Sequence, residues 1–278
     1  MKTKTLLTVL FCTIISTSIF SQSPWTQQKN KAFIQTGFSG IFYDKIRVNK
    51  NDQAVNSNVS DITTQLYAEY GILNKLDVSL IVPFKIISIA SNNGSKTESL
   101  TGLGNVTVGL KYILSDKNFK ISGGFYVSAN TRQTNTDAAL QTGYNATTIL
   151  PYLSMGSSSG KIYYFVNMGY GYMTNNFTDF IKIGGEIGYN FIKKTHVIFN
   201  FELKKATNTE SNFDSLTNKL FQSTALYIDS QEYLSIGLKL NHEIITNKFG
   251  VTVGAIGAPY LSNLPVAPSI NAGVYLKL

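Results

Sequence analysis

The two histidines are the first residues to weigh for catalysis, because imidazole is the usual general acid or base near neutral pH. His196 and His242 fall in separate predicted strands, and no patterned cysteine accompanies them. A hydrolytic site needs a nucleophile, a base and an orienting group within reach of one another. We therefore expect no enzymatic activity, and a hydrolase is the weakest of the functions considered.

Three glycines could be mistaken for a phosphate-binding loop. Gly102, Gly104 and Gly109 stand close together, but such a loop requires a strand before it and a helix after it. Here the glycines lie inside a strand pattern with no helical pattern following, so small residues that allow a sheet to curve are the better interpretation. We expect no cofactor.

An Asn- and Asp-rich segment, 44–61, is the remaining candidate for ligand chemistry. It carries Asp44, Asp52 and Asp61, whose oxygens could bind calcium, but their spacing differs from that of an EF-hand loop. A solvated surface segment is the preferred interpretation, and no metal site is expected.

The charge pattern argues against nucleic-acid binding. The chain has 24 basic and 16 acidic residues, and its Lys and Arg side chains are scattered rather than clustered on one run. Aromatic residues are abundant, with 16 Tyr and 17 Phe against one Trp. Such an excess is typical of barrels that carry aromatic girdles at both membrane interfaces.

The first 22 residues have the features of a secretory signal. Lys2 and Lys4 precede an apolar stretch, 6–15, and small residues follow near a cleavage point before Gln22 or Ser23. The apolar stretch is too short to span a bilayer as a helix. The predicted domains are therefore a signal peptide, 1–22, and a mature domain, 23–278. The mature domain has no cysteine, because Cys12 lies in the signal.

The mature domain is a series of apolar/polar alternations, each about as long as a transmembrane strand. The clearest is 179–191, where Ile181, Ile183 and Ile187 alternate with Lys182 and Glu186. Twelve strands are predicted, at 32–43, 61–73, 76–88, 102–114, 119–131, 143–156, 161–173, 179–191, 196–206, 231–243, 248–257 and 269–278.

The breaks between these strands are alternately short and long, with five short turns and six longer connections. This order predicts an all-β fold, a transmembrane antiparallel up-and-down β-barrel of about 12 strands in a Gram-negative outer membrane, with both termini in the periplasm. A secreted soluble β-barrel with its apolar faces inside is the rival. Three features favour the membrane barrel over the soluble one: the charged residues on the second face of the strands, the length of the strands and the regular alternation of short and long connections.

Polar residues of the second strand face are the candidate lumen lining. Eight-stranded barrels are filled by their own side chains, whereas barrels of sixteen or more hold an aqueous channel. Twelve strands leave two possibilities open: a narrow pore, or a lumen occluded by inward loops or by the N-terminal segment 23–31. The candidate lining residues are Gln65, Glu69, Asn105, Lys111, Tyr126, Lys182, Glu186, Asn200, Glu202, Lys204, Tyr233, Lys239, Asn241 and Lys277.

Two local features, Pro83 and the C-terminal stretch 270–278, lead to further predictions. Pro83 lacks a backbone donor, which predicts a bulge or local break in its strand. The final residues, 270–278, resemble the C-terminal signature that outer-membrane assembly machinery recognises, although Leu278 replaces the usual Phe.

Three stretches resemble a known family. They are 24–27 (PWTQ), 70–84 (YGILNKLDVSLIVPF) and 102–112 (GLGNVTVGLKY). Together they are similar to a family of bacterial outer-membrane barrels labelled as transporters or as outer-membrane proteins of aromatic (phenol meta-pathway) degradation. The resemblance covers the first half of the chain by motif and the rest by strand rhythm.

The resemblance implies a barrel that passes small solutes, including apolar or aromatic ones. The main hypothesis is thus a passive channel whose partners are outer-membrane lipid and a small-molecule solute. The alternative is a non-conducting barrel whose long polar loops, 44–60 and 207–230, bind a partner or surface.

Overall fold

The computed structural model describes residues 22–48, 51–91, 97–208 and 224–278. Within this part of the chain, twelve antiparallel strands close into a barrel, as predicted. The barrel strands are β1 (Ala32–Val48), β2 (Asn51–Leu73), β3 (Leu76–Ser91), β4 (Thr97–Leu103) continued by β5 (Thr107–Asp116), β6 (Lys120–Ser128), β9 (Thr148–Ser159), β10 (Ile162–Met173), β11 (Phe180–Ile192), β12 (Thr195–Ala206), β13 (Glu232–Ile245), β14 (Phe249–Ser262) and β16 (Ser269–Lys277).

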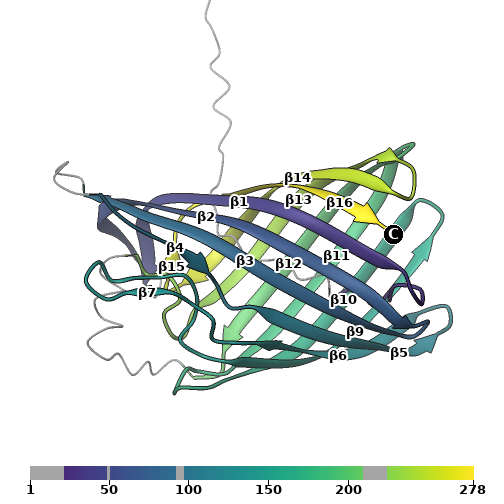
Figure 1. Ribbon diagram of the computed structural model, residues 1–278, viewed down its shortest axis with the longest axis horizontal. Coiled ribbons are helices and arrows are strands. Elements are labelled where there is room, and N and C mark those ends of the chain that lie inside the picture. The colour runs from purple at the N-terminus through teal and green to yellow at the C-terminus, as the bar shows by residue number, and fades with distance from the viewer. Residues whose placement is uncertain (1–21, 49–50, 92–96, 209–223) are drawn as a thin grey trace, which may run out of the picture.

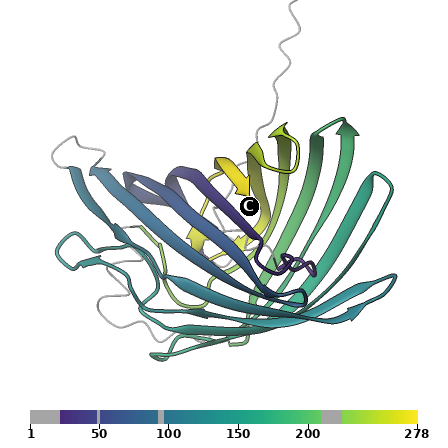
Figure 2. The same ribbon diagram turned by 45° about the vertical axis from the view of Figure 1, so that its right-hand side comes forward.

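Each strand pairs with the next along the chain, and β1 closes the barrel by pairing with β2 on one side and β16 on the other. Figure 1 shows the tilt of the strands, and Figure 2 shows the wall curving in the order of the colours. The short β15 (Leu264–Pro265) extends the pairing of β1 beyond β16. A separate small hairpin, β7 (Thr134–Asn135) with β8 (Leu140–Gln141), lies in the connection between β6 and β9.

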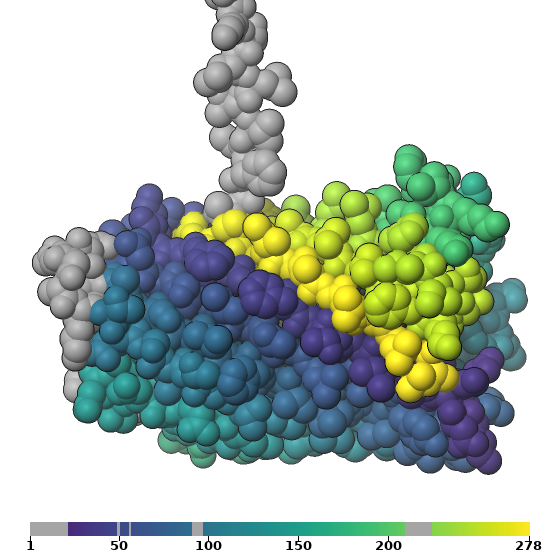
Figure 3. Space-filling view, turned by 45° about the horizontal axis from the view of Figure 1, so that its top comes forward, coloured from purple at the N-terminus to yellow at the C-terminus, as the bar shows by residue number. Residues whose placement is uncertain are grey.

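The apolar face of the strands points outward. Large apolar side chains such as Leu153, Met168 and Leu238 are more than half exposed on the barrel wall. Soluble proteins rarely expose continuous apolar surface of this extent, so the soluble rival is wrong. Figure 3 shows the wall unbroken where β16, in yellow, lies beside β1, in purple.

Aromatic side chains lie near both ends of this outer surface. Tyr112, Tyr189 and Phe191 are exposed toward the short turns, whereas Tyr170 and Tyr172 are exposed toward the long connections. Tyr and Phe in these two positions match the girdles expected at the two membrane interfaces. The described residues contain no helix that is long and apolar enough to cross a membrane.

The short turns and the C-terminus share one end of the barrel, which is the periplasmic end by the usual orientation. At the opposite end, the predicted polar loop 44–60 is wrong. β1 runs to Val48 and β2 starts at Asn51, so the two strands continue as a hairpin beyond the apolar band. The outward face of this hairpin is largely polar and exposed, whereas Ile46, Val55 and Val59 on its inward face are buried in an apolar cluster with loop residues such as Leu140 and Leu226. These three are too widely spaced to give the regular alternation that marks a membrane strand in sequence. The cross-strand pair Arg47–Asp52, at 2.5 Å, adds a polar contact.

The effect of Pro83 falls on its neighbour rather than on its own strand. β3 is continuous through Pro83, so the predicted interruption of that strand is wrong. The neighbouring strand is interrupted instead, between β4 and β5. At this interruption the Gly104 amide donates to the Pro83 carbonyl at 2.9 Å. Because proline cannot donate back, the ladder stops there on that side.

Candidate functional site

Within the part of the chain that the structure describes, two large cavities lie in series along the axis of the barrel. The outer chamber has a volume of about 250 Å³ and lies toward the long connections. The inner chamber has a volume of about 380 Å³ and lies toward the short turns. Ser39 and Gln65 line both chambers and mark the level where they meet.

The period of two in the strands decides which side chains reach these chambers. Along β2, Asp61 and Thr63 line the outer chamber, Gln65 lines both, and Tyr67 and Glu69 line the inner one. The residues between them face the membrane. One strand therefore supplies polar groups to both chambers, from the end with the long connections to the end with the short turns.

Loop segments cover the extracellular side of the outer chamber. Leu140, from the β6–β9 connection, and Leu226 and Ile228, from the connection before β13, pack with Ile41 and Ile87 of the wall. These apolar contacts bury the loop side chains almost completely. The outer end is therefore closed by packed loop residues rather than by wall side chains alone.

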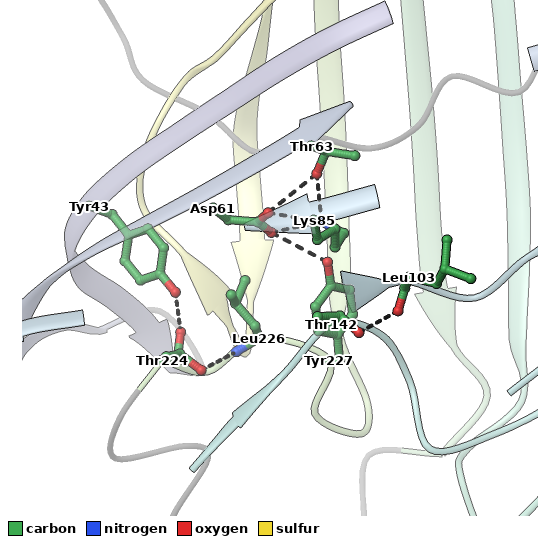
Figure 4. A network of polar contacts seen from close by, with 9 residues as sticks. All are labelled: Tyr43, Asp61, Thr63, Lys85, Leu103, Thr142, Thr224, Leu226 and Tyr227. Carbon is green, nitrogen blue, oxygen red and sulfur yellow. Dashed lines mark hydrogen bonds and ion pairs between the residues drawn. The ribbon is translucent and has the colours of Figure 1, made fainter. Parts of the chain in front are cut away.

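Hydrogen bonds fix these loops to the wall (Figure 4). The Tyr43 hydroxyl donates to the Thr224 carbonyl at 2.5 Å. The Gln141 side-chain amide donates to the Tyr227 carbonyl at 3.1 Å, which ties the two loops together. The loops thus have a defined position that depends on a small number of polar contacts.

A buried ion pair lies beneath this cover. Lys85 Nζ is 2.9 Å from both carboxylate oxygens of Asp61 and donates to Thr63 Oγ1 at 2.8 Å (Figure 4). The Tyr227 hydroxyl donates to Asp61 at 3.3 Å. Burial, and then the Asp61 charge, raise the pKa of Tyr227 well above its usual value, so this hydroxyl stays protonated. Asp61 is therefore a buried ion-pair partner, and its interpretation as part of a solvated surface segment is wrong.

Two lysines lie side by side deeper in the outer chamber. Lys182 and Lys204 are cross-strand neighbours on β11 and β12. Lys182 Nζ is 2.8 Å from the Glu202 carboxylate, which also accepts from the Tyr233 hydroxyl at 2.5 Å. Lys204 instead lies over two aromatic rings, 4.5 Å from the centroid of Phe180 and 5.1 Å from that of Tyr144.

Just outside the lining of the inner chamber lies a lysine shared by two carboxylates. Lys111 Nζ is 3.3 Å from Glu69 and 3.4 Å from Asp77. Gln27, which precedes the first strand, contacts both acids: its side chain donates to Glu69 at 2.8 Å and its backbone amide donates to Asp77 at 3.2 Å. Residues near the N-terminus therefore enter the barrel and complete this cluster.

A second pair lies across the inner chamber. Lys239 Nζ is 2.8 Å from Glu186, which also accepts from the Tyr163 hydroxyl at 2.7 Å. The Trp25 ring meets Tyr163 and Phe165 edge-on, with centroids 6.0 Å apart in each case. Residues 22–31, hereafter the N-terminal segment, thus reach from β2 and β3 to β10 inside the periplasmic end.

A close backbone approach holds the N-terminal segment at its base. The Gly71 amide donates to the Lys31 carbonyl at 2.9 Å, and the Asn30 amide donates to the Gly71 carbonyl at 2.8 Å. A Cβ atom at Gly71 would lie 2.1 Å from the Gln28 carbonyl oxygen, so only glycine fits. Both occluding elements left open by the sequence, inward loops and the N-terminal segment, are therefore present.

The structure distributes the sequence-predicted lumen residues in four groups. Glu202 and Lys111 contact chamber residues from just outside the lining, Asn200 is buried in the wall, and Lys277 is exposed at the periplasmic rim, 2.6 Å from Glu243. The others line a chamber: Asn105, Tyr126, Lys182, Lys204 and Tyr233 the outer one, Glu69, Glu186, Lys239 and Asn241 the inner one, and Gln65 both.

Sequence reasoning missed two classes of interior residue. Asp77 and Lys85 lie on the inward face of β3, and the alternation of Val78, Leu80 and Val82 against them was the signal that could have found them. Loop residues such as Tyr144 and Tyr227 carry no such signal, because a loop has no period that indicates direction.

The family described as "Putative MetA-pathway of phenol degradation" matches residues 30–228 of the chain. The chain belongs to this family. The family resemblance inferred from the sequence is thereby confirmed, and the match extends from β1 through β12 to the loop that covers the outer chamber. No protein with a curated description matches the sequence.

Solved structures with the same fold are outer-membrane channels and porins. The COG4313 outer membrane channel from Pseudomonas putida F1 is similar with a TM-score of 0.70 at 14% identity, over 92% of this chain and 98% of that one. The NanC porin gives 0.55 at 12% identity, over 89% and 100%. The KdgM porin gives 0.52 at 11% identity, over 87% and 98%. With its apolar exterior, this member of the family is an outer-membrane β-barrel protein.

Proposed function

We propose that this protein is a passive outer-membrane channel for small solutes that have an apolar or aromatic part. The observation that carries the proposal is the pair of chambers in series inside one barrel. A barrel filled by its own side chains would have no room for both. A solute would diffuse through the outer chamber into the inner one, without a cofactor and without a chemical step.

The lining of the outer chamber supports this choice of solute. Ile81, Leu150 and Met173 contribute apolar surface beside the charged groups. Binding sites for small molecules combine mostly apolar walls with a few polar groups that fix orientation. The outer chamber has this composition, whereas a pore selective only for small ions needs no apolar surface.

The route to the membrane is part of the proposal. The signal 1–22 lies almost entirely outside the described residues, and we propose that its removal leaves 23–278 as the barrel domain. We also propose that the outer-membrane assembly machinery recognises 270–278. Within this stretch β16 pairs with β1, so the strand that carries the signature also closes the barrel.

Conductance in a planar lipid bilayer tests the channel, and uptake of a small aromatic solute into proteoliposomes tests its cargo. We expect small stepwise currents and uptake of phenol faster than into protein-free liposomes. Correctly folded protein that gives neither current nor uptake would contradict the proposal and favour a non-conducting barrel that binds a partner through its outer surface.

A further inference from the structure

We infer that the outer chamber is a binding site for small aromatic monocarboxylates, with Lys204 as the residue that binds the carboxylate. This inference deepens the proposed function and rests on it, because it names the class of solute that the outer chamber retains. It depends on three features of the chamber: an ammonium group without an acidic partner, aromatic rings beside that group, and an apolar space of suitable size.

Lys204 differs from the other lysines that line the chambers. Lys85 is paired with Asp61, Lys182 with Glu202 and Lys239 with Glu186, each at 2.8 to 2.9 Å. Among the described residues, no carboxylate lies within 4.0 Å of Lys204 Nζ, whose polar contact is a long one of 3.5 Å to the Tyr144 hydroxyl. A lysine in an enclosed chamber normally has an anionic partner, since charge is poorly solvated there.

The nearest acids are already engaged. Glu202 binds Lys182 and the Tyr233 hydroxyl. Asp229 accepts from the Thr178 amide at 2.7 Å and from the Thr178 hydroxyl at 2.8 Å. The cross-strand neighbour of Lys204 is Lys182, and two like charges opposite each other disfavour the pair. An anion bound at Lys204 would offset this repulsion.

The surroundings of Lys204 suit an aromatic anion better than an inorganic one. Phe180 and Tyr144 place ring faces at the ammonium, and Leu150, Met173 and Leu226 line the chamber nearby. These apolar surfaces leave little hydrogen bonding for a strongly hydrated ion. A benzene ring binds in a dry apolar cavity of about 150 Å³, so the chamber of about 250 Å³ accommodates one ring with its carboxylate.

The bound geometry follows from these contacts. The carboxylate accepts a charge-assisted hydrogen bond from Lys204 Nζ, and the ring lies against the apolar side chains of the chamber. The neutral analogue with the same ring would keep the apolar contacts and lose the ionic one. A carboxylate without a ring would keep the ionic contact and lose the apolar ones.

Calorimetry on the purified protein in lipid nanodiscs tests the site, with benzoate, benzyl alcohol and acetate as probes. We expect benzoate to bind about tenfold tighter than either analogue. Lys204→Met should remove that preference for benzoate over benzyl alcohol, and Lys204→Arg should retain most of it. Lys205→Met is the matched control, because Lys205 is the next residue on β12 but is half exposed and paired with Glu232 at 2.7 Å.

Equal binding of benzoate and benzyl alcohol to the unaltered protein would overturn the inference without any variant. So would a benzoate affinity that falls equally in the Lys204 and Lys205 variants. The measurement is independent of conduction. Benzoate binding by a barrel that carries no current and takes up no phenol would retain the site and reject the channel. A conducting barrel without a preference for benzoate would retain the channel and reject the site.

Discussion

The two chambers carry opposite excesses of charge. The outer chamber, with the groups its lining contacts, has three lysines, Lys85, Lys182 and Lys204, and two acids, Asp61 and Glu202. The inner chamber, with the groups its lining contacts, has two lysines, Lys111 and Lys239, with three acids, Glu69, Asp77 and Glu186. A solute moving inward would therefore meet a surplus of positive charge first and a surplus of negative charge second.

The covers of the chambers differ as well. The outer cover consists of loops attached at both ends to strands, and it is fixed by apolar packing and by hydrogen bonds such as Tyr43 to Thr224. The inner cover, the N-terminal segment, joins the wall through β1 and is fixed inside the barrel by Trp25 and Gln27. The outer cover is therefore held largely by apolar packing, and the inner cover largely by polar and aromatic contacts.

The largest expected effect is on stability, from breaking the outer ion pair. Asp61→Asn removes the only carboxylate paired with Lys85 in the described structure and leaves a buried ammonium uncompensated. Loss of one partner of a buried ion pair lowers the free energy of unfolding by about 3–5 kcal/mol. Because chamber water can reach Lys85, we expect a loss at the lower end of this range, about 3 kcal/mol. Urea unfolding in lipid vesicles measures the change. Asp61→Asn combined with Lys85→Met should recover much of it, and an unchanged single variant would contradict the assignment.

The second expected effect is on conductance, from removing the inner cover. Deletion of residues 22–28 takes away Trp25 and Gln27 but keeps the Asn30 contact at Gly71. We expect a several-fold increase in single-channel conductance, because the inner chamber would open to the periplasm. Thr26→Ala is a suitable control, since Thr26 donates to the exposed Asn74 carbonyl at the rim. Unchanged conductance after the deletion would show that the narrowest point lies in the outer half.

The contrast between the chambers also shows how far sequence could predict the molecule. A membrane strand has an apolar side and a polar side, so apolar and polar residues alternate along it. This alternation was enough to predict the strands and to place Glu69, Lys182 and Lys239 on the inward face. It could not pair Lys182 with Glu202 rather than with Glu186, since pairing depends on side-chain reach across strands. The loop residue Tyr227 was beyond prediction for a different reason: its position depends on tertiary packing and not on any local period.

The third expected effect is on ion selectivity, and it separates the chambers directly. Lys182→Glu reverses the charge surplus of the outer chamber, whereas Lys239→Glu only adds to the negative surplus of the inner one. Reversal potentials under a salt gradient should shift toward cations in both variants, and further in Lys182→Glu. Two unchanged reversal potentials would reject the placement of both lysines on the conduction path, and a larger shift in the Lys239 variant would place the selective region in the inner chamber.

The smallest expected effect comes from the inner counterpart of the Asp61 experiment. Glu69→Gln is the same change of carboxylate to amide, but Lys111 keeps Asp77 as a partner at 3.4 Å. The amide oxygen can still accept from the Tyr67 hydroxyl, and the amide NH2 can donate to Gln27 once the Gln27 side-chain amide has turned over. The loss should therefore be about 1 kcal/mol, the usual contribution of a single hydrogen bond. Urea unfolding under the conditions used for Asp61→Asn makes the two values comparable. A cost as large as that of Asp61→Asn would mean that Asp77 does not compensate Lys111. In that case Lys111 would depend on Glu69 as strongly as Lys85 depends on Asp61, and the larger number of acids around the inner chamber would not lower the cost of losing one of them.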